Sequence, residues 1–245
     1  MGKILKEPRR ALRRKALAWR DGIAARSPHW VRRSIGPLVD YADMLLIDHG
    51  LFRLVYLNHH RIGPHAWRSA QPSPRDIAGM ARSGIKTIVN LRGERDCGAY
   101  RLQIAACKRH GIRLEELVVK SRAAPTREQV HEARALFARA VHPILLHCKS
   151  GADRAGLAST LYLILAEDVP VEAAVAQLSA RYGHFKQADT GIIDAFFQAY
   201  VEANRERPMP FLTWVDTVYD PQVLTRDFKT GRWANIMVNT ILRRE

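Results

Sequence analysis

The sequence contains little cysteine, and this scarcity excludes two kinds of small domain. Three cysteines occur among 245 residues, at Cys97, Cys107 and Cys148, and no pair has CxxC spacing. So sparse and odd-numbered a set argues against a disulfide framework and against a zinc site, and it fits a reducing compartment. We therefore expect neither a metal nor another cofactor.

Long apolar runs are also missing. The most apolar early window, residues 43–57, is interrupted by Asp48, His49 and Arg53, whereas a membrane span needs about 20 nearly uncharged residues. The basic first residues lack the apolar core of a secretory signal. Glycine and proline, at 15 and 12 residues, are not enriched, so most of the chain should be globular. We expect a cytoplasmic protein without a transmembrane helix.

Acidic residues are scarce near the start of the chain. Residues 1–35 carry eleven Lys and Arg against Glu7 and Asp21, a net charge of +9 out of +15 for the whole chain. Apolar residues recur there at helical spacing, at Leu5, Leu12, Ala16, Trp19 and Ile23. A basic amphipathic helix over residues 3–33 can lie on the anionic inner face of a membrane, or it can pack as a solvated arm on its own domain. Nucleic acid is the less favoured partner.

Beyond residue 66, short apolar runs alternate with segments of helical periodicity. The pattern predicts strands at residues 85–91, 112–119 and 142–147, and helices at 73–84, 98–110, 126–141, 157–168, 171–183 and 189–204. Strands that alternate with helices of about 12 residues indicate an α/β fold with a mostly parallel central sheet. We expect a basic helical extension at residues 1–62, a core at 63–206 and a helical tail at 207–245 packed on that core.

The stretch HCKSGADRAG, residues 147–156, joins the apolar strand 142–147 to a helix-forming run. A loop at a helix N-terminus presents backbone N–H groups to an anion. Cys148 lies at the base of this loop, where oriented amides favour the nucleophilic thiolate. Arg154 ends the loop with a planar fork that suits two phosphate oxygens. The predicted phosphate-binding residues are Lys149, Ser150, Gly151, Ala152 and Arg154.

This stretch resembles the signature of the protein tyrosine and dual-specificity phosphatase superfamily, which is His-Cys, five residues, then Arg. Residues 67–94, WRSAQPSPRDIAGMARSGIKTIVNLRGE, are similar to the opening of the compact bacterial dual-specificity-like members. The resemblance covers roughly residues 66–200. It implies the phosphatase fold, with helices flanking the sheet, and attack by Cys148 on phosphorus to form a cysteinyl-phosphate that water hydrolyses. It also implies that Arg154 and the loop amides hold the phosphoryl oxygens.

Two residues depart from the usual pattern of the superfamily. Ala155 stands where relatives place a Ser or Thr whose hydroxyl stabilises the departing thiolate. The stretch 114–126 contains no Asp where many relatives carry their general acid. Asp153, inside the loop, resembles the loop aspartate of myotubularin-type lipid phosphatases, so we expect it to be the general acid, against the alternative that it caps the following helix. Asp96 is the reserve candidate.

The sequence leaves more than one substrate and more than one function open. Phosphotyrosine in a phosphoprotein is the default substrate of the superfamily, whereas the Asp153-Arg154 pair, Lys149 and the basic start favour a membrane lipid phosphate or a sugar phosphate. Because Ala155 lacks a hydroxyl, a weakly active pseudophosphatase adaptor is the alternative, and a rhodanese-like sulfurtransferase is less favoured. Arg68, Arg92 and Arg122 are further candidates to line an anionic pocket.

Overall fold

The computed structural model describes residues 29–47 and 56–230, which contain a five-stranded sheet with the strand order β1-β2-β5-β3-β4. The strands are β1 (His60–Gly63), β2 (Ala66–Ser69), β3 (Thr87–Asn90), β4 (Arg113–Glu116) and β5 (Ile144–His147). β1 pairs with β2 in antiparallel fashion, and the remaining pairs are parallel. The prediction of an α/β fold with a mostly parallel sheet is therefore confirmed.

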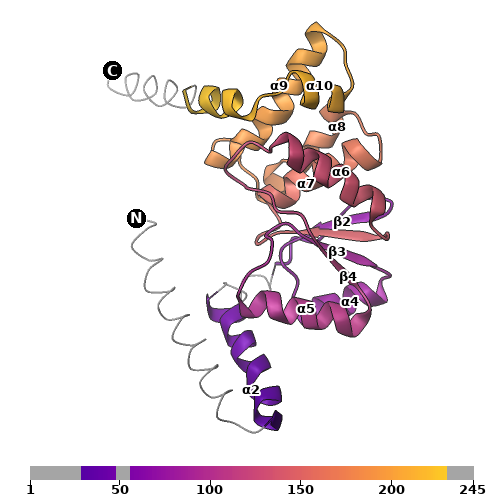
Figure 1. The fold of residues 1–245 in the computed structure, drawn as a ribbon, viewed down its shortest axis with the longest axis vertical. Helices are drawn as coiled ribbons and strands as arrows, with labels where there is room; N and C mark the ends of the chain where they lie inside the picture. Colours follow the sequence, from indigo (N-terminus) through magenta and orange to yellow (C-terminus); the bar gives the residue numbers. More distant parts are fainter. Residues whose placement is uncertain (1–28, 48–55, 231–245) are drawn as a thin grey trace, which may run out of the picture.

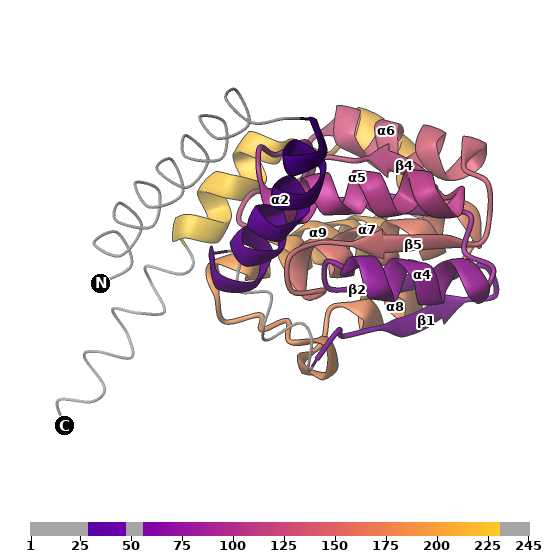
Figure 2. The same ribbon diagram turned by 90° about the horizontal axis from the view of Figure 1, so that it is seen from below.

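Helices cover both faces of the sheet (Figure 1). α4 (Pro74–Arg82) and α5 (Gly98–His110) cover one face. The other is covered by α6 (Arg127–Arg139), α7 (Asp153–Ala166), α8 (Val171–Ala174), α9 (Ile192–Glu206) and α10 (Phe211–Thr217). α2 (His29–Ala42), followed by the π-helical η1 (Asp43–Ile47), packs on the outer side of α5 (Figure 2). Three 3-10 turns complete the chain path: η2 (Val175–Gln177), η3 (Ala180–Tyr182) and η4 (Asp189–Gly191).

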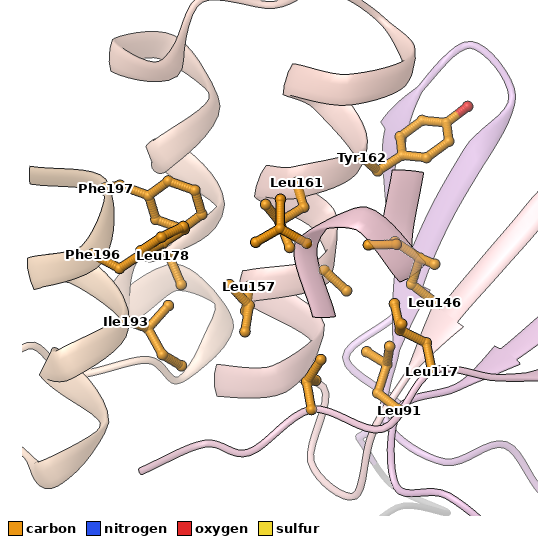
Figure 3. Packing of buried hydrophobic residues seen from close by; sticks show 14 of the residues in the cluster. Leu91, Leu117, Leu146, Leu157, Leu161, Tyr162, Leu178, Ile193, Phe196 and Phe197 are labelled. Carbon is orange, nitrogen blue, oxygen red and sulfur yellow. The ribbon is translucent and has the colours of Figure 1, made fainter. Parts of the chain in front are cut away.

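The central strand β5 contributes side chains to two hydrophobic cores, because its side chains alternate between the faces of the sheet. Ile144 and Leu146 belong to the larger cluster under α6, α7 and α9, whereas Leu145 belongs to the cluster under α4 and α5. Figure 3 shows the larger cluster, in which Leu157 and Leu161 of α7 lie between the sheet and Phe196 of α9. α7, which follows β5 after residues 148–152, is thereby packed on two sides.

Local helix signals in the sequence match the observed helix ends. Ser73 and Thr126 cap α4 and α6 with reciprocal capping boxes. α5 covers residues 98–110 as predicted and ends at Gly111, whose φ of 64° lies in the left-handed region that glycine tolerates.

The predicted single helix at residues 171–183 is wrong. The chain forms only α8 there, followed by the turns η2 and η3. Two buried side chains donate hydrogen bonds to backbone carbonyls of this segment, which a regular helix would use within itself. Arg68 donates to the carbonyl oxygen of Gln177, and Asn58 donates to that of Tyr182. Strand β1, which begins at His60 inside the expected N-terminal extension, was not anticipated.

The C-terminal helix α10 packs on the rest of the protein. Its residues Phe211, Trp214 and Val215 are buried in the larger core cluster. Residues 221–230 are helical, and the predicted tail beyond residue 230 lies outside the described residues. So does the basic segment 3–33, except for its last five residues at the start of α2. Within the described residues, no helix is both long and apolar enough to cross a membrane.

The contact between α2 and α5 generates a test. Asp43 accepts a hydrogen bond from the Gly98 amide at 2.6 Å, and Asp40 pairs with Arg101 at 2.7 Å. A Cβ atom at Gly98 would lie 2.3 Å from the backbone oxygen of Asp40, a separation that requires α2 to move away.

We therefore expect Gly98→Ala to lower the melting temperature by several degrees, at about 2–4 °C per kcal/mol for a domain of this size. Gly79→Ala is the matched control, since the nearest heavy atom to its new Cβ would be Arg82 Nη2 at 3.9 Å. In the interior of α4 that change should stabilise by up to about 1 kcal/mol. A melting temperature for Gly98→Ala equal to that of Gly79→Ala would show that α2 is not packed in this way.

Candidate active site

Three parallel strands end at the same edge of the sheet. His147, the last residue of β5, is in register with Ser69 of β2 on one side and with Asn90 of β3 on the other. The carboxyl edge of a parallel sheet, next to a central strand, is where α/β proteins bind ligands. Cys148 follows directly, is buried, and donates its amide to the Ser69 carbonyl at 3.4 Å.

Gly151 determines how closely the loop at residues 148–154, hereafter the 148–154 loop, approaches β2. Its φ of +75° is a left-handed conformation, and a Cβ there would lie 2.6 Å from the Ala70 nitrogen and 2.8 Å from the Ser69 carbonyl carbon. Because backbone atoms of a paired strand cannot move aside, only glycine fits this position. Successive backbone N–H groups around such a residue form an anion-binding concavity.

Arg68 holds this loop from the inside of the protein. Its Nη2 donates to the carbonyl oxygens of Gly151 and Ala152, at 2.8 and 2.9 Å. Its Nη1 donates to the backbone and side-chain oxygens of Gln177, at 2.6 and 3.0 Å. The guanidinium also stacks 4.1 Å from the ring centre of Tyr182. One side chain of β2 thereby joins the loop to the chain that follows α8.

Asn58 holds the carbonyl of Ser150, the residue before Gly151, in the same way. Its Nδ2 donates to the carbonyl oxygens of Ser150, at 3.1 Å, and of Tyr182, at 2.9 Å. Its Oδ1 accepts from the Tyr56 hydroxyl at 3.2 Å and lies 3.0 Å from His60 Nε2. Nothing in the sequence marked Asn58, although its φ of +49° is one that asparagine tolerates better than most residues.

The direction of the loop amides follows from these contacts. In a trans peptide the C=O of one residue and the N–H of the next point in opposite directions. The carbonyls of Ser150, Gly151 and Ala152 are held by Asn58 and Arg68. The amides of Gly151, Ala152 and Asp153 consequently point away from those two side chains, as three successive donors at the start of α7.

The expectation that Arg68 lines an anionic pocket is not what the structure shows, because its side chain is fully buried behind the loop. Burial lowers the pKa of Arg68 to about 10, partly opposed by Tyr182 and by the nearby negative charges of Cys148 and Asp153. The group therefore stays charged at neutral pH. Its positive charge lies under the 148–154 loop, where it favours an anion bound above.

A second buried chain of polar groups reaches His147. Gln103 Nε2 of α5 lies 2.6 Å from His147 Nε2, and His147 Nδ1 lies 3.4 Å from the Cys148 carbonyl oxygen. Gln103 in turn accepts from Gln71, and Gln71 accepts from Arg92. Arg92, another candidate pocket residue, is thus engaged beside β3, and Arg122 is exposed.

Asp153 is placed differently from a helix cap. Ala152 is the N-cap residue of α7 and no side-chain cap hydrogen bond is made, while Asp153 is the first helical residue. Its Oδ1 accepts a hydrogen bond from His184 Nδ1 at 2.8 Å. The sequence analysis missed His184, which lies in the turn after η3 and carries no recognisable motif.

The other candidate residues have clear locations. Lys149 and Arg154 are half-buried and Ser150 is exposed on the 148–154 loop. Ala155 is fully buried in the first turn of α7. Asp96, the reserve acid, is on the loop before α5, where its side chain is 78% exposed and pairs with Arg101.

Comparisons with known proteins find similar sequences and similar structures. The sequence model of one family, described as DSP-PTPase phosphatase fused to NAD+ kinase, matches residues 59–191, more than half of the chain. The curated dual specificity protein phosphatase TpbA of Pseudomonas aeruginosa is 26% identical over 136 residues, covering 54% of this chain and 57% of the relative. The chain thus spans little more than half the length of the curated relatives that it matches.

Solved structures have somewhat lower sequence identity to this chain than the curated relative. The crystal structure of P. aeruginosa TpbA has 24% identity and a TM-score of 0.49, covering 62% of this chain and 91% of that one. The crystal structure of Tk-PTP in the active form has 18% identity and a TM-score of 0.45, covering 62% and 99%.

Substitution of Gly151 tests the close approach of the loop to β2. We expect Gly151→Ala to abolish protection of the protein by inorganic phosphate or vanadate in a thermal-shift assay and to destabilise it by more than about 3 kcal/mol, because left-handed strain adds to a backbone clash. Gly111→Ala is the control, since Gly111 has a φ of +64° with no atom within 4 Å of a new Cβ. It should lose only about 1–2 kcal/mol and keep phosphate protection. Equal losses in both variants would refute the close approach.

Proposed function

The chain belongs to this family of cysteine-dependent phosphatases, and we therefore propose that it is a metal-independent phosphomonoesterase that acts through a cysteinyl-phosphate intermediate. The observation that carries the proposal is the 148–154 loop. Asn58 and Arg68 hold three of its carbonyls from the inside of the protein, so three successive amides point to the opposite side. Amides held in place before substrate arrives need no reorganisation when charge develops on the phosphoryl oxygens.

In the first chemical step, the Cys148 sulfur forms a bond to phosphorus while the bond from phosphorus to the leaving oxygen breaks. The loop amides and the guanidinium of Arg154 bind the three non-bridging oxygens. A planar fork that donates two parallel hydrogen bonds suits this role better than a point charge. Asp153, next to Arg154 at the start of α7, gives a proton to the leaving oxygen.

In the second step, water attacks phosphorus and the Cys148 thiolate departs. The buried Ala155 offers no hydroxyl at this point of α7, so we expect the thiolate to depart more slowly than from a site with Ser or Thr there. The same feature supports the second candidate function, a weakly active phosphate-binding adaptor.

For the substrate we propose phosphotyrosine in a phosphoprotein first, supported by the dual specificity phosphatases among the curated relatives. Lys149 and Arg154 at the loop and the basic segment 3–33 support a membrane lipid phosphate or a sugar phosphate. Release of phosphate from matched concentrations of phosphotyrosine peptides, phosphoserine peptides, phospholipid vesicles and sugar phosphates separates these classes.

The first functional test concerns the nucleophile. We expect the wild type to release phosphate from nitrophenyl phosphate without added metal, and Cys148→Ser to abolish turnover while retaining phosphate binding, since the amides remain. Arg154→Lys should lose far more than tenfold in kcat/KM, a factor that corresponds to about 1.4 kcal/mol, because an ammonium cannot make the two-pronged contact. Turnover by Cys148→Ser at the wild-type rate would refute the mechanism. A wild type that binds phosphate without turnover would favour the adaptor.

The second functional test concerns the acid. Asp153→Asn should remove the alkaline limb of the pH–rate profile and cost about 10²- to 10⁴-fold on alkyl phosphates, whose leaving group needs a proton. The loss should be small on nitrophenyl phosphate, whose leaving group does not. Asp96→Asn is the matched control and should leave both rates near those of the wild type. Equal modest losses on both substrates in Asp153→Asn would instead assign the acid role elsewhere.

A further inference from the structure

A buried histidine links the 148–154 loop to a helix outside it. His184 has no exposed side-chain surface, and both of its ring nitrogens face carboxylates. Nδ1 lies 2.8 Å from Asp153 Oδ1, and Nε2 lies 2.6 Å from Asp194 Oδ2. Asp153 is the first residue of α7, and Asp194 is in the first turn of α9, so this histidine joins the starts of two helices.

The two carboxylates determine how His184 is protonated. Burial by itself lowers the pKa of a histidine, but the hydrogen bonds to Asp153 and Asp194 and their negative charges raise that of His184 to about 9. Both ring nitrogens therefore carry protons at neutral pH, and each donates to one carboxylate.

The backbone holds His184 in place independently of any ligand. Its amide donates to the Ser179 carbonyl at 3.2 Å. Farther along, a Cβ at Gly191 would lie 2.0 Å from the Lys186 carbonyl oxygen, so the turn from residue 186 to 191 closes too tightly for any side chain there. Two other charges act on the group: Lys186 Nζ is 4.0 Å from Asp194 Oδ1, and the charge of Arg68 acts on Asp153 from β2.

We propose that His184 is a positioning residue that fixes the orientation of the Asp153 carboxyl group and supplies the proton that Asp153 gives to the leaving oxygen, with Asp194 orienting His184 from behind. This inference rests on the proposed function, since it assigns His184 a part in the same reaction. Asp153 takes up the Nδ1 proton of His184 as it gives a proton to the leaving oxygen, so the alkaline limb of the pH–rate profile belongs to the hydrogen-bonded pair. Activity on alkyl phosphates should accordingly fall as the pH rises through about 9, where His184 loses a proton.

A double-mutant cycle tests whether His184 acts through Asp153. On an alkyl phosphate, His184→Gln should lower kcat by roughly 10²-fold with little change in KM, as a misplaced catalytic group does. The loss on nitrophenyl phosphate should be small. Because both substitutions remove the function of one carboxyl, the double variant with Asp153→Asn should be no slower than Asp153→Asn alone. Additive losses, or equal losses on both substrates, would overturn the proposal.

Substitution of Asp194 by asparagine tests the role of His184 through the pH of the alkaline limb. A purely structural role of His184 would leave that pH unchanged. Asp194→Asn leaves the His184–Asp153 contact but removes one negative charge, so the alkaline limb should shift down by roughly one pH unit or more. The same shift should appear in the NMR titration of the His184 ring in the resting protein. Asp216→Asn is the matched control, because Asp216 is also 2.6 Å from a histidine Nε2, that of exposed His131, and it should leave both titrations unchanged. An unmoved limb in Asp194→Asn would overturn the proposal.

The two proposals fail in different ways. A wild type without phosphatase activity would overturn the proposed function and the part assigned to His184 together. An active wild type with an additive cycle or an unmoved alkaline limb would overturn only the role of His184.

Discussion

The guanidinium of Arg68 is a charge placed entirely inside the protein, and the geometry of the 148–154 loop depends on how that charge is satisfied. An unpaired buried ion costs several kcal/mol, whereas hydrogen bonds to a charged group contribute about 1.5–3 kcal/mol each. Arg68 meets this requirement with carbonyl oxygens from Gly151, Ala152 and Gln177. The same contacts that stabilise the charge rotate the loop peptides so that their amides point to the opposite side. Folding of the core therefore also sets the direction of the loop amides.

That arrangement also explains the irregular chain after α8. A regular helix would keep the Gln177 carbonyl for a hydrogen bond within the helix, but Arg68 takes it, and Asn58 takes the Tyr182 carbonyl. The chain consequently turns at η2 and η3 and brings His184 to Asp153. Close packing supports this path, because a Cβ at Gly156 would lie 2.8 Å from Leu178 Cδ2 and 3.2 Å from the Gln177 oxygen. The segment after α8 thus acts as the outer support of the loop.

The site is enclosed by segments that are distant in sequence. On one side, α5 contributes Gln103, whose Nε2 lies 2.6 Å from His147 Nε2. On the other side, the turn before α9 contributes His184. η1, which follows α2, contacts the N-terminal end of α5 through the hydrogen bond between Asp43 and the Gly98 amide.

The sequence by itself determined the features that depend on neighbouring residues. Alternating periodicities predicted the α/β fold, Ser73 and Thr126 marked helix starts, and Gly111 marked a helix end. The stretch from His147 to Gly156 marked the loop, and its resemblance to a known signature indicated the family. Only the tertiary structure decided the roles of Arg68, Asn58 and His184. Their contacts with the loop join residues 83, 92 and 31 positions apart. Hydrophobic periodicity and capping describe interactions within a few residues, so a side chain whose partner arrives from another strand or turn leaves no local pattern from which its role can be read.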